Sequence, residues 1–153
     1  MTVGAWVLVV AVGAALAFGG YRAATDGRFR GDPSRPVAGA PPTSGTEQGR
    51  LVAELGEELG ERATLLQFSS AFCAPCRTTR QVLADVAELV PGVTHVEVDA
   101  EQHLDLVRRV GVMRTPTTLV LDGAGREVTR ATGAPQRDQV LSALAGLPDR
   151  PRT

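Results

Sequence analysis

The two cysteines of the chain, Cys73 and Cys76, are three positions apart and offer the clearest chemistry in the sequence. A disulfide scaffold uses several cysteines spread along a chain, and a bridge across so short a loop restricts the unfolded state far less than one closing a long loop. The pair is therefore interpreted as chemical rather than structural. On a helix, Cys76 follows Cys73 by about one turn, which places both sulfurs on one face and within bridging distance.

The segments on either side of the cysteines predict where the pair lies. A short apolar run predicts a buried strand over 64–69, and the pattern over 75–90 predicts a helix. Cys73 would then stand at the start of the helix, where unpaired backbone N–H groups and the helix dipole favour the thiolate, the nucleophilic form of cysteine. Pro75 suits the first turn because its missing N–H is not needed there.

A zinc site is the main alternative interpretation of such a pair. Structural zinc normally takes four ligands, and the other candidates in this chain are His95 and His103. His95 falls on a predicted strand and His103 near the start of a predicted helix, so their convergence on the cysteines is not indicated. The sequence favours thiol–disulfide exchange through a redox-active Cys73–Cys76 disulfide, with no organic cofactor or metal.

The hydrophobic pattern after residue 48 predicts the helices and strands around this pair. Helices are predicted near 51–59, 75–90, 101–110 and 135–144, and strands at 64–69, 93–98, 117–121 and 126–132. Residues 122–125 predict a hairpin turn between the last two strands. Alternating helices and strands that end in a hairpin predict a mixed sheet with helices on both faces.

The N-terminal segment predicts a membrane anchor over residues 1–21. Residues 3–20 carry no charge, and as a helix they would be about 27 Å long, close to the bilayer core of about 30 Å. A signal peptide, the main alternative, needs a basic stretch before its apolar run, and only Met1 and Thr2 precede this one. A buried core helix would show a polar face.

The remaining boundaries follow from composition. Residues 22–47 are rich in Arg, Gly, Pro, Ser and Thr and predict a flexible linker, 48–147 the folded domain, and 148–153 a tail. Because Arg and Lys near a span favour the cytoplasmic side, the flank predicts a single-pass cell-membrane protein whose domain faces the cytoplasm; an extracytoplasmic domain is the alternative. The basic residues that carry this prediction are Arg22, Arg28, Arg30 and Arg35. The net charge of -1 gives no reason to expect nucleic acid as a partner.

Several motifs taken together resemble the thioredoxin family over about 51–147. They are FCAPC at 72–76, VDAE at 98–101, GVMRTPT at 111–117, DGAGR at 122–126, and Gly133 before the last helix. The resemblance implies a thioredoxin-like α/β fold, with a central mixed sheet flanked by helices, here preceded by a single N-terminal transmembrane helix. It also implies a protein-disulfide oxidoreductase, which the predicted anchor would tether to a membrane.

The resemblance assigns roles to individual residues. It implies that Cys73 is the exposed attacking thiol, that Cys76 is the buried resolving thiol, and that Pro116 is a cis-proline facing them. The backbone of Thr115 is expected to pair with an extended substrate segment. The neighbours of the dithiol are also expected to contact the substrate: Phe72, Ala74 and Pro75.

The chain departs from the family pattern around the dithiol. Phe72 stands where thioredoxins usually have tryptophan, and Ala74 stands where the usual dipeptide has glycine. Gln67 replaces a buried aspartate that helps to move the proton of the resolving thiol, and an amide cannot act as that base. His95 aligns near the family's buried lysine, either as a proton relay or as an ordinary strand residue. The usual first strand is not obvious before Leu51.

The expected partners are protein thiols and disulfides, together with an unidentified electron donor. The Ala-Pro dipeptide and the cytoplasmic placement favour a reductase. Two alternatives stay open: an oxidase or isomerase outside the membrane, and a thioredoxin-like interaction or metal-handling module with little turnover.

Overall fold

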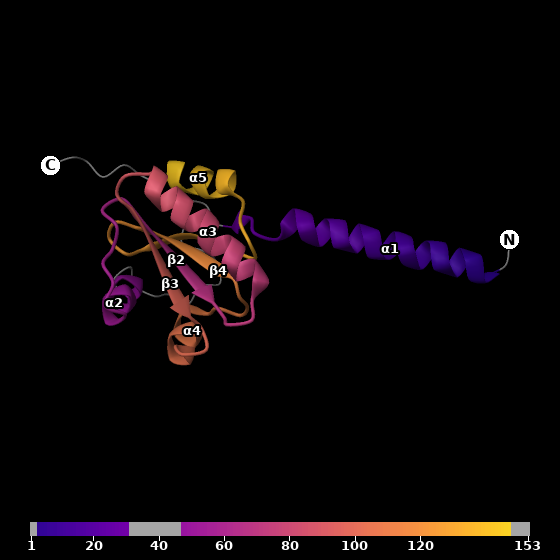
Figure 1. The fold of residues 1–153 in the computed structure, drawn as a ribbon, viewed down its shortest axis with the longest axis horizontal. Coiled ribbons are helices and arrows are strands. Elements are labelled where there is room, and N and C mark those ends of the chain that lie inside the picture. The colour runs from indigo at the N-terminus through magenta and orange to yellow at the C-terminus, as the bar shows by residue number, and fades with distance from the viewer. Residues whose placement is uncertain (1–2, 31–46, 148–153) are drawn as a thin grey trace.

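The computed structural model describes residues 3–30 and 47–147, and the rest of the predicted linker and the tail lie outside this part of the chain (Figure 1). The helices are α1 (Val3–Thr25), α2 (Glu47–Glu54), α3 (Ala74–Leu89), α4 (Leu104–Val110) and α5 (Arg137–Ala145). The strands are β1 (Phe29–Arg30), β2 (Ala63–Ser69), β3 (Val93–Asp99), β4 (Thr117–Asp122) and β5 (Glu127–Thr132).

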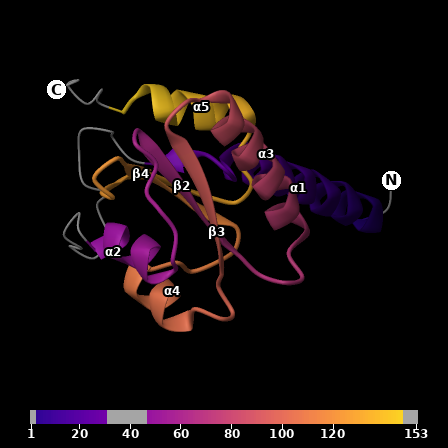
Figure 2. The same cartoon turned by 60° about the vertical axis from the view of Figure 1, so that its left-hand side comes forward.

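The strands form one mixed sheet in the order β1-β5-β4-β2-β3. β2 and β3 are parallel, and the other neighbouring pairs are antiparallel. Figures 1 and 2 show α3 and α5 on one face of the sheet and α2 and α4 on the other. This arrangement confirms the predicted mixed sheet with helices on both faces.

Each face of the sheet has its own apolar core. On one side, Leu83 of α3 and Val140 of α5 pack with Leu65 of β2. On the other, Val52 of α2 and Leu106 of α4 belong to the core that contains the opposite face of β2. Because helices cover both faces, all seven residues of β2 are buried. This explains why apolar and polar residues do not alternate along β2.

Helix α4 begins three residues later than the sequence predicts. The carboxylate of Asp99 accepts a hydrogen bond from the backbone N–H of Glu101 at 2.9 Å and another from the side chain of Gln102 at 2.7 Å. These contacts hold the residues after β3 in a turn, so the helix starts only at Leu104.

Helix α1 is the one helix of the described residues that is long and apolar enough to cross a membrane. The apolar stretch runs over Gly4–Arg22 with a mean hydropathy of 1.8, and none of it is buried against the domain. A signal sequence near an N-terminus passes the same test of length and composition, so the anchor stays a prediction.

The first residues of the predicted linker are ordered. Helix α1 continues to Thr25, and Phe29 and Arg30 pair with Ala131 and Arg130 of β5. Without β1, the outer edge of β5 would carry unpaired backbone N–H and C=O groups, and residues 29–30 bond to them. Phe29 also packs against the core beneath α5. A strand of two residues has no alternation to detect, which is why the sequence does not predict it. Strand β1 forms one edge of the sheet, and β3 forms the other edge.

Candidate active site

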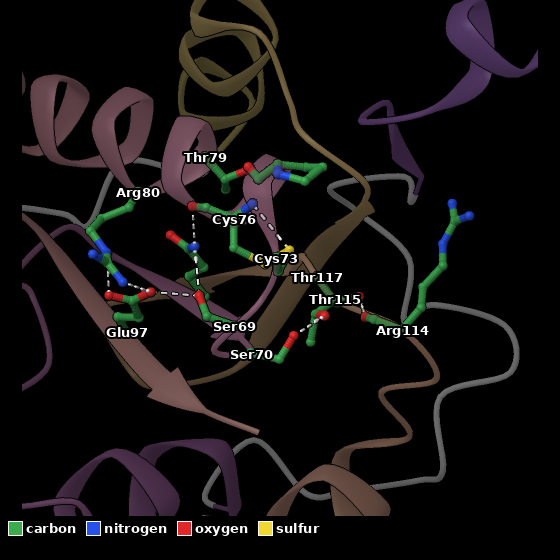
Figure 3. Close-up of a disulfide and its surroundings, with 12 residues drawn as sticks. Ser69, Ser70, Cys73, Cys76, Thr79, Arg80, Glu97, Arg114, Thr115 and Thr117 are labelled. Carbon is green, nitrogen blue, oxygen red and sulfur yellow. Dashed lines mark hydrogen bonds and ion pairs between the residues drawn. A yellow bond between two sulfur atoms is a disulfide. The ribbon is translucent and has the colours of Figure 1, made fainter. Parts of the chain in front are cut away.

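The two cysteines lie at the start of α3, shortly after the end of β2, as the sequence predicts. Cys73 caps the N-terminus of α3, and it forms a disulfide with Cys76 across a Cα–Cα distance of 5.2 Å (Figure 3). Cys73 is partly exposed, whereas Cys76 is only 2% exposed. The backbone N–H of Cys76 donates to the sulfur of Cys73 at 3.1 Å. The same donor would stabilise negative charge on Cys73 in the reduced protein.

A second loop reaches the cysteines from a distant part of the chain. The Thr115–Pro116 bond is cis, which confirms that feature of the prediction for Pro116. The hydroxyl groups of Thr115 and Ser70 share a hydrogen bond of 2.9 Å, and the backbone N–H of Cys73 donates to the carbonyl of Ser70 at 3.3 Å. The loop of the cis-proline therefore contacts the loop of the cysteines directly.

Exposed apolar side chains surround this junction. Phe72 is fully exposed, and Ala74 and Pro75 are exposed beside it, as a surface that contacts a partner requires. Met113, two residues before Thr115, is 93% exposed. The sequence does not single out Met113, because an apolar residue in a loop gives no periodic signal.

Gln67, where the resemblance noted above implies an aspartate, is buried beside the disulfide. Its side chain is fully buried, and its amide nitrogen donates to the hydroxyl of Ser69 at 2.8 Å and to the carbonyl oxygen of Cys76 at 3.0 Å. Its amide oxygen lies 3.1 Å from Nε2 of His95. The amide therefore ties Cys76 to β2 and β3, and both N–H groups and the oxygen of the Gln67 amide take part in hydrogen bonds.

His95 is half-buried on β3 beside this amide. Burial lowers the pKa of His95, and the charge of Arg80 lowers it further, while Glu97 opposes both. The imidazole is therefore neutral at neutral pH, and since Gln67 presents an oxygen to it, Nε2 is the donor.

A carboxylate that the sequence does not single out completes the polar network. Glu97 accepts a hydrogen bond of 2.5 Å from the Ser69 hydroxyl and forms an ion pair with Arg80 of α3, with contacts of 2.5 and 2.7 Å. Burial raises the pKa of Glu97, but hydrogen bonds from Arg80 and Ser69 outweigh it, so this pKa lies below its usual value. The parallel register sets Gln67 opposite Glu97, a pairing that only the assembled sheet reveals.

A cavity of about 350 Å³ opens beside the disulfide. Both cysteines line it, together with Arg80, Glu97 and Asp99. The ionised Glu97 and Cys76 therefore line the same cavity.

The histidines do not join the cysteines. His95 is bonded to Gln67, and His103 is exposed at the start of α4. Over 3–30 and 47–147, no group of three or more His, Cys, Asp or Glu residues is arranged to hold a metal ion.

Comparison with known proteins gives concordant results. The Thioredoxin family model matches residues 52–146. The chain is 30% identical over 89 residues to a thioredoxin of Alicyclobacillus acidocaldarius, across 58% of this chain and 84% of that protein. It is 28% identical over 86 residues to Thioredoxin H4-1 of Oryza sativa subsp. japonica, across 55% of this chain and 65% of that protein.

Solved structures show the same fold. A mutant thioredoxin from Halobacterium salinarum NRC-1 superimposes with a TM-score of 0.56 at 19% identity, covering 70% of this chain and 88% of that one. A Schistosoma mansoni thioredoxin superimposes with a TM-score of 0.54 at 19% identity, covering 65% and 91%.

Proposed function

The chain belongs to the thioredoxin family, and from that premise we propose that it is a membrane-tethered reductase of protein disulfides, acting through Cys73 and Cys76. Its thiol–disulfide oxidoreductase activity follows from the family and from the disulfide between these residues. The observation that carries the assignment of roles is the difference in burial. Cys73 is partly exposed at a helix start, and Cys76 is 2% exposed behind it.

The reduced dithiol would act in two exchange steps. The Cys73 thiolate attacks one sulfur of a substrate disulfide, forms a mixed disulfide and releases the other substrate sulfur as a thiolate. The Cys76 thiolate then attacks the Cys73 sulfur, which restores the Cys73–Cys76 disulfide and releases the second substrate thiolate. Two electrons pass to the substrate, and a separate dithiol donor must return them.

The proposed substrate surface surrounds Cys73. Thr115 and the cis-proline Pro116 lie across from the cysteine loop, where the Thr115 backbone would pair with an extended substrate segment. Phe72, Ala74 and Pro75 are exposed on the near side and would contact residues flanking the substrate disulfide. None of these contacts requires a cofactor or a metal.

The sequence supports three parts of this proposal: the membrane tether, the side of the membrane on which the domain lies, and the direction of exchange. Gly4–Arg22 is long and apolar enough for a single span. The arginines that follow it support a domain on the cytoplasmic side, where thiols are kept reduced. A domain on the opposite side would favour an oxidase or isomerase instead.

The test is to trap substrates in cells with the full chain carrying Cys76→Ser. Removal of the resolving thiol should let mixed disulfides on Cys73 accumulate, as reductant-sensitive bands that the Cys73→Ser/Cys76→Ser control lacks. Trapped cysteines on the cytoplasmic side, whether in soluble or in membrane proteins, would support the reductase. Trapped cysteines on the extracytoplasmic side would overturn the proposed topology. Absence of any band that depends on Cys73 would contradict the exchange mechanism itself.

A further inference from the structure

The end of α1 is docked against the rim of the active site. The carboxylate of Asp26, directly after the helix, lies 2.9 Å from the guanidinium of Arg114. Arg114 is the residue before Thr115 and the cis-proline Pro116. The contact therefore joins the end of the proposed anchor to the loop that faces the dithiol.

Backbone packing makes this junction tight. The N–H of Gly27 donates to the carbonyl of Thr132 at 2.9 Å, and a Cβ on Gly27 would lie 2.1 Å from the carbonyl oxygen of Ala134. A Cβ on Gly133 would lie 2.9 Å from the nitrogen of Gly27. Both glycines also have positive φ, at 76° and 95°. The backbone at Gly27 therefore packs directly against the backbone of residues 133–134. Two residues after Gly27, β1 begins and pairs with β5.

The apolar stretch of α1 ends close to this junction. It runs to Arg22, and the backbone N–H of Asp26 donates to the carbonyl of Arg22 at 2.9 Å, which continues the helical hydrogen-bonding pattern. Four helical residues rise by about 6 Å, so the span would end within about one turn of Asp26. Figures 1 and 2 both show α1 leaving the domain on the side where β2 ends and α3 begins.

A short series of contacts connects the junction to the attacking cysteine. Asp26 binds Arg114, the neighbouring Thr115 bonds to Ser70, and Ser70 accepts the N–H of Cys73. The dithiol is thus fixed relative to the proposed span by folded structure rather than by a long flexible linker.

We propose that the dithiol is held at the membrane surface and acts on those disulfides of membrane proteins that lie next to the lipid headgroups. This inference rests on the proposed membrane tether. The bilayer would obstruct a large soluble protein approaching from the side on which α1 emerges. A disulfide beside a membrane-spanning segment would meet the dithiol directly. The exposed apolar side chains of Phe72 and Met113 on the same rim suit such a juxtamembrane segment.

The experiment uses the full chain in phosphatidylcholine–phosphatidylglycerol vesicles, reduced beforehand and freed of reductant. Two lipid-anchored fluorogenic peptides carry the same disulfide, one beside the headgroup and one at the end of a long polymer spacer. A third, free peptide reports basal exchange. We expect the headgroup disulfide to be reduced about 10-fold faster than the spacer-held one, because a fixed geometry raises its effective concentration at Cys73.

Two glycine variants form a matched pair. Gly27→Ala forces a Cβ into the Ala134 carbonyl, whereas Gly56→Ala has the same φ of 76° and meets nothing within 4 Å. Gly27→Ala should abolish the preference for the headgroup disulfide and leave reduction of the free peptide unchanged, and Gly56→Ala should retain both. Asp26→Asn, which removes the ion pair, should weaken the preference without a steric clash.

The possible failures are distinguishable. Equal rates on the two anchored peptides, with the free peptide still reduced, would overturn the membrane-surface inference and leave the exchange function standing. A preference that survives in Gly27→Ala would overturn the role of the docked junction. If alkaline carbonate releases the chain from the vesicles, the proposed membrane tether is contradicted. Failure to reduce any peptide would contradict the proposed function.

Discussion

Gln67 is a fully buried amide beside the disulfide, at a position where the resemblance to thioredoxins implies an aspartate. An aspartate at this position could hold a proton for Cys76, the proposed resolving thiol. Gln67 instead links Ser69, His95 and the Cys76 carbonyl through one amide. The charged acid of the network is Glu97 on the neighbouring strand, which accepts from Ser69 and pairs with Arg80.

Replacing Gln67 should therefore cost stability. Gln67→Leu removes two donated hydrogen bonds and leaves buried polar partners unpaired, for which we expect a loss of about 1–3 kcal/mol in the free energy of unfolding. Denaturant unfolding of the oxidised chain in detergent measures this change. Gln81→Leu is the control, because the Gln81 amide is exposed and donates to the exposed Asp85, and its effect should stay within about 0.5 kcal/mol. Equal effects would contradict the structural role.

Glu97 predicts a pH dependence. Its pKa is lowered in the folded protein, so its ionised form adds stability above the pKa of an ordinary glutamate, about 4.3, and this contribution is lost as pH falls through the lower folded-state pKa. Glu97→Gln should lower the Tm at neutral pH, and the difference from the parent should shrink toward acid. The exposed Glu101→Gln serves as the control. A difference that does not depend on pH would contradict the prediction.

At the scale of elements, the long periodic segments were predictable from the sequence and the contacts between elements were not. Helix α3 and strand β2 follow from apolar spacing, a proline in the first turn and the position of the cysteines. Strand β1 is too short to give a pattern, and it exists because β5 offers it an edge. The pairing of Gln67 with Glu97 and the docking of Asp26 on Arg114 likewise depend on register and on chain paths.

The hairpin between β4 and β5 shows how a locally encoded element can be tested. One carboxylate oxygen of Asp122 accepts the N–H groups of Ala124 and Arg126 at 2.9 and 3.0 Å, and the other pairs with the Arg126 side chain. Asp122→Ala should lower the free energy of unfolding by about 1–3 kcal/mol and speed hydrogen exchange along β4 and β5. Asp122→Asn retains one acceptor and should lose less. Equal losses would show that the turn does not depend on these bonds.

At the scale of the whole molecule, the junction between α1 and the domain determines which end of the domain faces the proposed membrane. The cysteines lie at the start of α3, and Glu88 lies near its other end, roughly 20 Å away at the rise of an α-helix. A fluorophore on Cys73 in the Cys76→Ser chain should therefore be quenched by headgroup-labelled nitroxide lipids. The same fluorophore on a Glu88→Cys chain, with both native cysteines changed to serine, should be quenched several-fold less. Equal quenching would mean that the domain rotates freely about its tether, and stronger quenching at position 88 would place the dithiol away from the bilayer.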